Sequence, residues 1–230
     1  MIVRTMTLPE MVADARQDYK ALMNKVDSLL PKLRRMHLRD RAETISHLLP
    51  WRSPRGNNWL LHFSLRKAGL LMHPLVWSYD ARGRIFGLIV TPSGSTYCLD
   101  NHLLQRYGER FDPTANPLQR LRNFFQENYS YSAECTEQVG EDRFKVQVGM
   151  CHGMGLGEWD RKEGLVYINT FVNHGQLFQN QADSMERMDF ERLLHQLSAS
   201  QRRHLVALYK RKYPEDVGKP GMEWLERFAA

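Results

Sequence analysis

The stretch Leu75-Val-Trp-Ser-Tyr-Asp-Ala-Arg-Gly-Arg-Ile-Phe-Gly-Leu-Ile-Val90 decides the fold class of this chain. Two runs of bulky apolar residues, 75–79 and 85–90, flank the turn Asp80-Ala-Arg-Gly83. Aliphatic and aromatic residues of this kind favour strands, and a short connection that contains glycine is typical of a β-hairpin. The sequence therefore predicts an antiparallel hairpin at its centre.

Further strand-like runs lie on both sides of this hairpin. Alternating or bulky apolar residues fill 59–65, 96–99, 129–135, 144–150, 155–159 and 165–172. The last two runs flank Asp160-Arg-Lys-Glu-Gly164, which predicts another hairpin. The glycine-rich stretch 149–157 indicates a hairpin with bulges, or strands that pack closely against a helix. The sequence thus predicts an antiparallel sheet core over residues 57–180.

Two helices are expected inside this core, between residues 100 and 128. Asp100 can cap a helix that runs to Phe111, and Asn116-Pro117 supplies a cap and a first-turn proline for a second helix. Gly108 lies inside the first of these helices, where it allows either close packing or a local break.

Helical flanks are expected at 1–56 and 181–230. The N-terminal flank has one amphipathic run capped by Thr7 and interrupted or kinked at Pro31, and a second over Arg39–Leu49. The C-terminal flank has helices over 190–197, 201–213 and 222–228, the first two capped by Asp189 and Ser200. The predicted fold class is α+β, an antiparallel sheet core with helical N- and C-terminal flanks in one compact unit.

Composition limits the function classes. The 230 residues carry a net charge of +6, which favours anionic partners such as RNA. The three cysteines are widely spaced and form no CxxC pair, so a cytoplasmic location is expected. No long apolar run or signal-like start is present, so no membrane association is expected. No cofactor is indicated, and a protein partner or a homo-oligomer stays open.

The main site candidate is the polar side of the first inserted helix. His102, Arg106 and Arg110 recur every four residues, which aligns one imidazole and two guanidinium groups on one helix face. These groups suit a phosphate-bearing substrate, because the imidazole moves protons near neutral pH and guanidinium groups bind oxyanions. The alternative is a solvated face, on which the arginines pair with Glu109 or other acids.

Other residues are secondary candidates. His152 lies at the bend of the glycine-rich stretch, and Thr170 is either an ordinary strand residue or presents its hydroxyl toward the His102 helix. Arg120 and Arg122 form the polar side of the second inserted helix. No metal-binding motif, nucleotide-binding loop or serine-nucleophile motif is present.

The order of these pieces resembles the small ribonuclease toxins of the RelE and BrnT kind, within the barnase–colicin–RelE-like group. The resemblance covers about residues 96–172, with the helix pattern His102-x-x-x-Arg106-x-x-x-Arg110 ahead of an antiparallel sheet. It implies metal-independent cleavage of RNA, with His102 as general acid or base and the two arginines neutralising transition-state charge. Thr170 and Tyr107 would orient the phosphate or the leaving oxygen, unless Tyr107 packs in the core.

A non-catalytic function is the alternative. The C-terminal helices carry a group of basic residues: Arg202, Arg203, Lys210, Arg211 and Lys212. These helices are compatible with a helix-turn-helix-like nucleic-acid-binding unit, a solvated amphipathic surface or a protein-interaction module.

Overall fold

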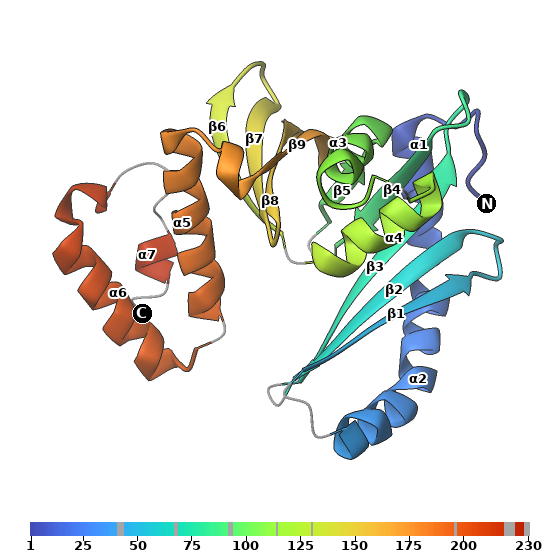
Figure 1. Cartoon of the computed structure of the whole chain (residues 1–230), viewed down its shortest axis with the longest axis horizontal. Coiled ribbons are helices and arrows are strands. Elements are labelled where there is room, and N and C mark those ends of the chain that lie inside the picture. Colours follow the sequence, from blue (N-terminus) through green and yellow to red (C-terminus); the bar gives the residue numbers. More distant parts are fainter. Residues whose placement is uncertain are drawn as a thin grey trace.

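The computed structural model describes residues 1–40, 44–66, 69–91, 94–113, 115–129, 131–195, 197–218 and 224–227 (Figure 1). The helices are α1 (Leu8–Gln17), α2 (Tyr19–Asp40), α3 (Asn101–Phe111), α4 (Pro117–Glu127), α5 (Gln179–His195), α6 (Ala199–Lys212) and α7 (Trp224–Arg227), with short 3₁₀ turns η1 (His174–Gln176) and η2 (Pro214–Asp216). The strands are β1 (Thr44–Arg52), β2 (Asn58–Arg66), β3 (Gly69–Tyr79), β4 (Ile85–Val90), β5 (Thr96–Leu99), β6 (Ser132–Gln138), β7 (Arg143–Met150), β8 (Gly153–Asp160) and β9 (Leu165–Asn173).

Within the described residues, all strands join one sheet in the order β1-β2-β3-β4-β5-β9-β8-β7-β6. The α+β class is confirmed, but the predicted purely antiparallel core is wrong because β5 and β9 pair in parallel. The chain leaves β5 through α3 and α4, forms β6 to β8, and returns beside β5 as β9. Parallel neighbours require such a long crossover, which joins the two antiparallel halves into one mixed sheet.

Helices cover both faces of the sheet. The odd-numbered residues of β2, among them Trp59, Leu61 and Phe63, pack in one buried cluster with α1 and α2. Leu60 of the same strand lies in a second cluster with residues of α3 and α4, including Tyr107 and Phe124. Successive strand side chains point to opposite faces, so α1 and α2 cover one face and α3 and α4 the other (Figure 1).

The two N-terminal helices divide at Asp18. As predicted, α1 begins after Thr7, whose backbone N–H donates to Glu10 Oε2 at 2.7 Å. The predicted interruption at Pro31 is wrong, because α2 continues through it. The chain bends instead at Asp18, a buried carboxylate that accepts from Trp59 Nε1 at 2.9 Å and Asn57 Nδ2 at 2.8 Å. These hydrogen bonds attach the helix junction to β2.

The predicted helix over Arg39–Leu49 is wrong from Thr44 onward, and the segment 1–56 is therefore not helical throughout. Residues 44–52 form β1, which pairs antiparallel with β2 along its whole length. The side chains of Leu49 and Trp51 pack against the cluster beneath α1 and α2. Pairing with an adjacent strand and burial of these residues outweigh the local helical pattern.

The inserted helices form as predicted. Asp100 accepts from Leu103 N at 2.8 Å, and Asn116 accepts from Gln119 N at 2.8 Å, so both caps are confirmed. Gly108 does not break α3, which reaches Phe111. A Cβ atom there would lie 2.1 Å from Arg120 Nε, so close packing of α4 against α3 explains the glycine.

The C-terminal helices differ in their limits from the prediction. Asp189 lies inside α5 and does not begin a helix, and Ser198, not Ser200, caps α6. The predicted helix 222–228 contains α7, and its remaining residues lie outside the described ones. Figure 1 shows α5 beside the β6–β8 end of the sheet and α6 on the far side of α5, and Met185 and Met188 of α5 pack in a buried cluster with Met154 of β8. Arg187 of α5 binds Glu134 of β6, with Nη2 to Oε1 at 2.9 Å. In the described part of the chain no helix is long and apolar enough to cross a membrane.

Candidate functional site

His102, Arg106 and Arg110 follow one side of α3 as predicted, but their surroundings differ. His102 is exposed on the first turn, eight residues before Arg110, so about 12 Å of helix separates the two backbones. Arg106 is exposed and forms an ion pair with Glu109 at 3.1 Å. The alternative expected for these arginines, pairing with Glu109, is therefore found for Arg106.

Arg110 joins α3 to the sheet. Its Nη1 donates to the carbonyl oxygens of Arg106 at 2.9 Å and Phe171 at 3.1 Å, and its Nε donates to Gln176 Oε1 at 3.0 Å. Within the described residues its Nη2 forms no hydrogen bond. The guanidinium group is thus fixed at the end of β9 by backbone oxygens, with one nitrogen left to bind an anion.

Tyr107 and His152, both predicted as binding residues, meet beside Arg110. The Tyr107 hydroxyl lies 3.2 Å from His152 Nδ1, and their rings are parallel within 6°. Burial raises the pKa of Tyr107 to about 12, so its hydroxyl keeps its proton at neutral pH. Tyr107 is both a core residue, only 2% exposed, and a hydrogen-bond partner of the histidine.

The turn that carries His152 is held from below. The backbone N–H of His152 donates at 2.9 Å to the side-chain oxygen of Asn128, which is fully buried at the end of α4. Phe111, 43% exposed, stacks on the imidazole with ring centroids 4.8 Å apart. A buried amide and two aromatic rings therefore fix the position of His152.

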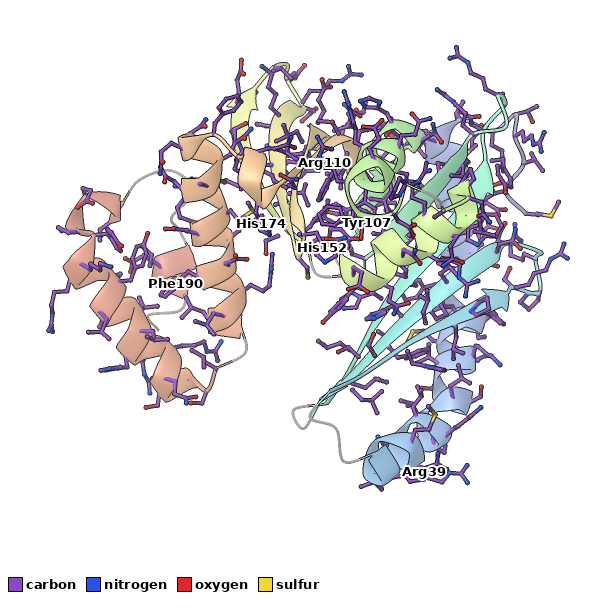
Figure 2. All side chains as sticks on the ribbon, viewed as in Figure 1. Arg39, Tyr107, Arg110, His152, His174 and Phe190 are labelled. Atoms are coloured by element: carbon purple, nitrogen blue, oxygen red, sulfur yellow. The ribbon has the colours of Figure 1, made fainter. Side chains whose placement is uncertain are left out.

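A second histidine, His174 in η1, is found only in the structure. Its Nε2 lies 3.0 Å from the carbonyl oxygen of Cys151, the residue next to His152. A carbonyl only accepts, so Nε2 carries the proton, and Nδ1 is the unprotonated nitrogen of the neutral ring. Figure 2 shows Tyr107, Arg110 and His152 beside α3, and His174 between these residues and α5. The sequence signal available was a histidine directly after a strand, where loops commonly carry functional groups.

Thr170 does not join this group, because a bulge changes the register of β9. Thr170 pairs with Leu156, whereas Ile168 pairs with Gly157, so Asn169 is an extra residue. Ile168 and Phe171 consequently both pack with Tyr107 in the cluster under α3. The side chain of Thr170, next to Phe171, points to the opposite face of the sheet, so of the two interpretations of Thr170 the register of β9 fits the ordinary strand residue.

The arginines of α4 have structural environments. Arg120 crosses Gly108 of α3, and its Nη2 donates to the Ala115 carbonyl oxygen at 3.1 Å. Arg122 is half-buried, and its Nε atom is buried without a hydrogen-bond partner among the described residues. These contacts place Arg120 in the α3–α4 interface and do not bring either side chain to His152.

The glycine-rich stretch forms the β7–β8 hairpin, as predicted. A Cβ atom on Gly157 would lie 1.7 Å from the carbonyl oxygen of Tyr167, so β9 approaches it too closely for any side chain. Within the described ranges no three His, Cys, Asp or Glu side chains are grouped as a metal site. No protein-family model, curated protein or solved structure matches the chain, so its function is inferred from this geometry.

Proposed function

We propose that the protein cleaves RNA by a metal-independent attack of the ribose 2′-hydroxyl on the adjacent phosphate. The observation that supports this most is that His174 Nε2 lies 3.0 Å from the carbonyl oxygen of Cys151, the residue next to His152, while Arg110 binds the Phe171 carbonyl oxygen near the end of β9. Two imidazoles supply a general base and a general acid, and a fixed guanidinium supplies charge for the phosphate. The proposal keeps the chemistry implied by the resemblance to the RelE and BrnT toxins, but moves proton transfer from His102 to this pair.

His174 is assigned as the base. Its unprotonated Nδ1 accepts the proton of the 2′-hydroxyl, and the 2′-oxygen forms a bond to phosphorus. His152, in its protonated form, gives the Nε2 proton to the 5′-oxygen as the P–O5′ bond breaks. Its Nδ1–H then donates to the Tyr107 hydroxyl, which holds the ring in place. The products are a 2′,3′-cyclic phosphate and a free 5′-hydroxyl.

Arg110 is assigned to the phosphate. Its Nη2 donates to a non-bridging oxygen while Nη1 and Nε keep their bonds to β9 and η1. Because those bonds already fix the guanidinium, little ordering is required when negative charge develops. RNA as the partner and the cytoplasm as the compartment belong to the same proposal, which the basic net charge supports.

Single-stranded RNA oligonucleotides and their 2′-deoxy analogues test the proposal. Cleavage should produce 2′,3′-cyclic phosphate ends from RNA and nothing from the deoxy analogue. His152→Ala, His174→Ala and Arg110→Ala should each lower the rate by about 10²- to 10⁴-fold. His102→Ala is the matched control and should keep near-full activity.

Two results would overturn the assignment. One is no cleavage of any RNA by a folded, full-length protein. The other is loss of activity in His102→Ala with retention in His174→Ala, which would return the chemistry to the N-terminal end of α3. Circular dichroism of each variant separates loss of activity from loss of fold.

A further inference from the structure

A pocket of about 620 Å³ lies between the N-terminal half of α5 and the C-terminal half of α6. This volume suits a ligand of nucleotide size. Among the residues that line it are Glu186, Phe190, Tyr209, Lys212 and Tyr213. Figure 2 shows Phe190 on the side of α5 that faces α6. None of these residues belongs to the site at the end of β9.

One wall of the pocket is aromatic. The Phe190 and Tyr209 rings stack with centroids 5.0 Å apart. The Tyr213 ring is tilted by 46° against Tyr209, with the two centroids 4.9 Å apart. All three side chains are half-buried, so part of each ring is accessible from the pocket. Half-exposed rings of this kind bind flat, aromatic ligands by stacking.

The pocket is also lined by four charged side chains of both signs, and two of them have the following side-chain partners. Arg187 binds Glu134, and Asp183 accepts from Gln179 Nε2 at 2.8 Å. Glu186 forms no hydrogen bond or ion pair with the described residues, although it lines the pocket. A ligand for this pocket therefore needs hydrogen-bond donors that match a carboxylate.

Lys212 provides the opposite charge. Its ammonium nitrogen lies 5.0 Å from the centre of the Tyr213 ring. Hydrogen bonding to Tyr213 and the nearby negative charge of Glu186 raise the pKa of Lys212, so it is cationic at neutral pH. An exposed ammonium beside an aromatic wall suits a phosphate group attached to the stacked ring system.

We propose that this pocket binds a guanine nucleotide. The base stacks on the wall formed by Phe190, Tyr209 and Tyr213, and Glu186 accepts from the N1–H and N2–H groups of guanine. Adenine and uracil do not present two adjacent donors to one carboxylate. Lys212 binds the phosphate. The guanine comes from a free mononucleotide or from a base within RNA, and the recognition chemistry is the same.

Calorimetric titration of the full chain with GMP, IMP, AMP and guanosine tests the proposal. GMP should bind best. IMP, which lacks the N2 amino group, and AMP should bind about tenfold or more weakly. Guanosine should bind more weakly than GMP at low salt, and the difference should shrink in Lys212→Met.

Glu186→Gln should remove most of the preference for GMP over AMP. Glu163→Gln, the same change on the β8–β9 turn, is the matched control and should leave the preference unchanged. Tyr213→Leu should weaken all nucleotides together. His152→Ala should not alter GMP binding, so failure of this proposal and failure of the cleavage proposal are distinguishable.

The source of the guanine is resolved by comparing GMP with short RNAs that contain one guanine or only adenines. A guanine-dependent RNA that competes with GMP supports the RNA source, and GMP binding without RNA competition supports the free nucleotide. Equal binding of all bases, no GMP binding at millimolar concentration, or binding of spermidine or a basic peptide in place of nucleotides would each overturn the proposal.

Discussion

Replacing Gly108 by alanine should destabilise the protein, although alanine is the better helix former. The new Cβ atom would lie 2.1 Å from Arg120 Nε and 2.6 Å from its Cδ. Arg120 must then move and lose its hydrogen bond to the Ala115 carbonyl oxygen, at 3.1 Å. Loss of a hydrogen bond from a charged donor costs about 1.5–3 kcal/mol, and the gain in helix propensity is about 1 kcal/mol. The net loss of unfolding free energy is thus about 0.5–2 kcal/mol.

The same substitution should have the opposite sign once Arg120 is removed. In an Arg120→Ala background no side chain occupies the space beside Gly108, so alanine should stabilise the protein by about 1 kcal/mol. Urea unfolding of the four proteins of this cycle, followed by tryptophan fluorescence, gives a coupling of about 1.5–3 kcal/mol. Equal effects of Gly108→Ala in both backgrounds would refute the α3–α4 packing argument.

Two further predictions concern His62 and Thr170. His62 is fully buried, and burial, followed by the nearby charge of His73, lowers its pKa to about 4. The pKa of this histidine in the unfolded chain is about 6.5, so between pH 6.5 and pH 4 the unfolded chain binds more protons than the folded protein. The free energy of unfolding should therefore fall by at most about 3 kcal/mol as the pH drops from 6.5 to 4. Urea unfolding across that range should show a smaller decrease in His62→Gln, and an unchanged decrease would contradict this origin. Thr170→Ala should leave RNA cleavage within about twofold in the oligonucleotide assay, because its side chain faces away from α3; a large loss would contradict the register of β9.

The parts of the fold that the sequence predicted correctly are those with local causes. The hairpin around Asp80–Gly83 and the caps at Asp100 and Asn116 depend on residues a few positions apart. Strand β1 was missed because its identity depends on pairing with β2. The parallel contact of β5 and β9 joins segments about 70 residues apart, and no local pattern records it.

Several residues of the candidate site were predictable one by one, but His174 was not, and neither was their grouping. Arg110 was identified from helix spacing, His152 from the glycine-rich bend and Tyr107 from the resemblance to the RelE and BrnT toxins. The structure brings Tyr107 and His152 into contact. The choice between the two interpretations of Thr170 depends on a bulge, because the extra residue Asn169 reverses the faces of β9 beyond it. A bulge depends on the partner strand, so the β9 sequence alone does not reveal it.

The difference between the two arginines of α3 explains why an aligned face is not itself a site. Among the described residues, exposed Arg106 forms an ion pair only with exposed Glu109, and such surface pairs contribute about 0–1 kcal/mol, so its guanidinium is weakly held. Arg110 is held by two backbone carbonyl oxygens and by Gln176, so its position follows from the docking of α3 on β9. Charge stabilisation in catalysis depends on groups that are already oriented before the reaction. Helix periodicity places both arginines on one side, but only the tertiary contact with β9 makes one of them a fixed anion ligand.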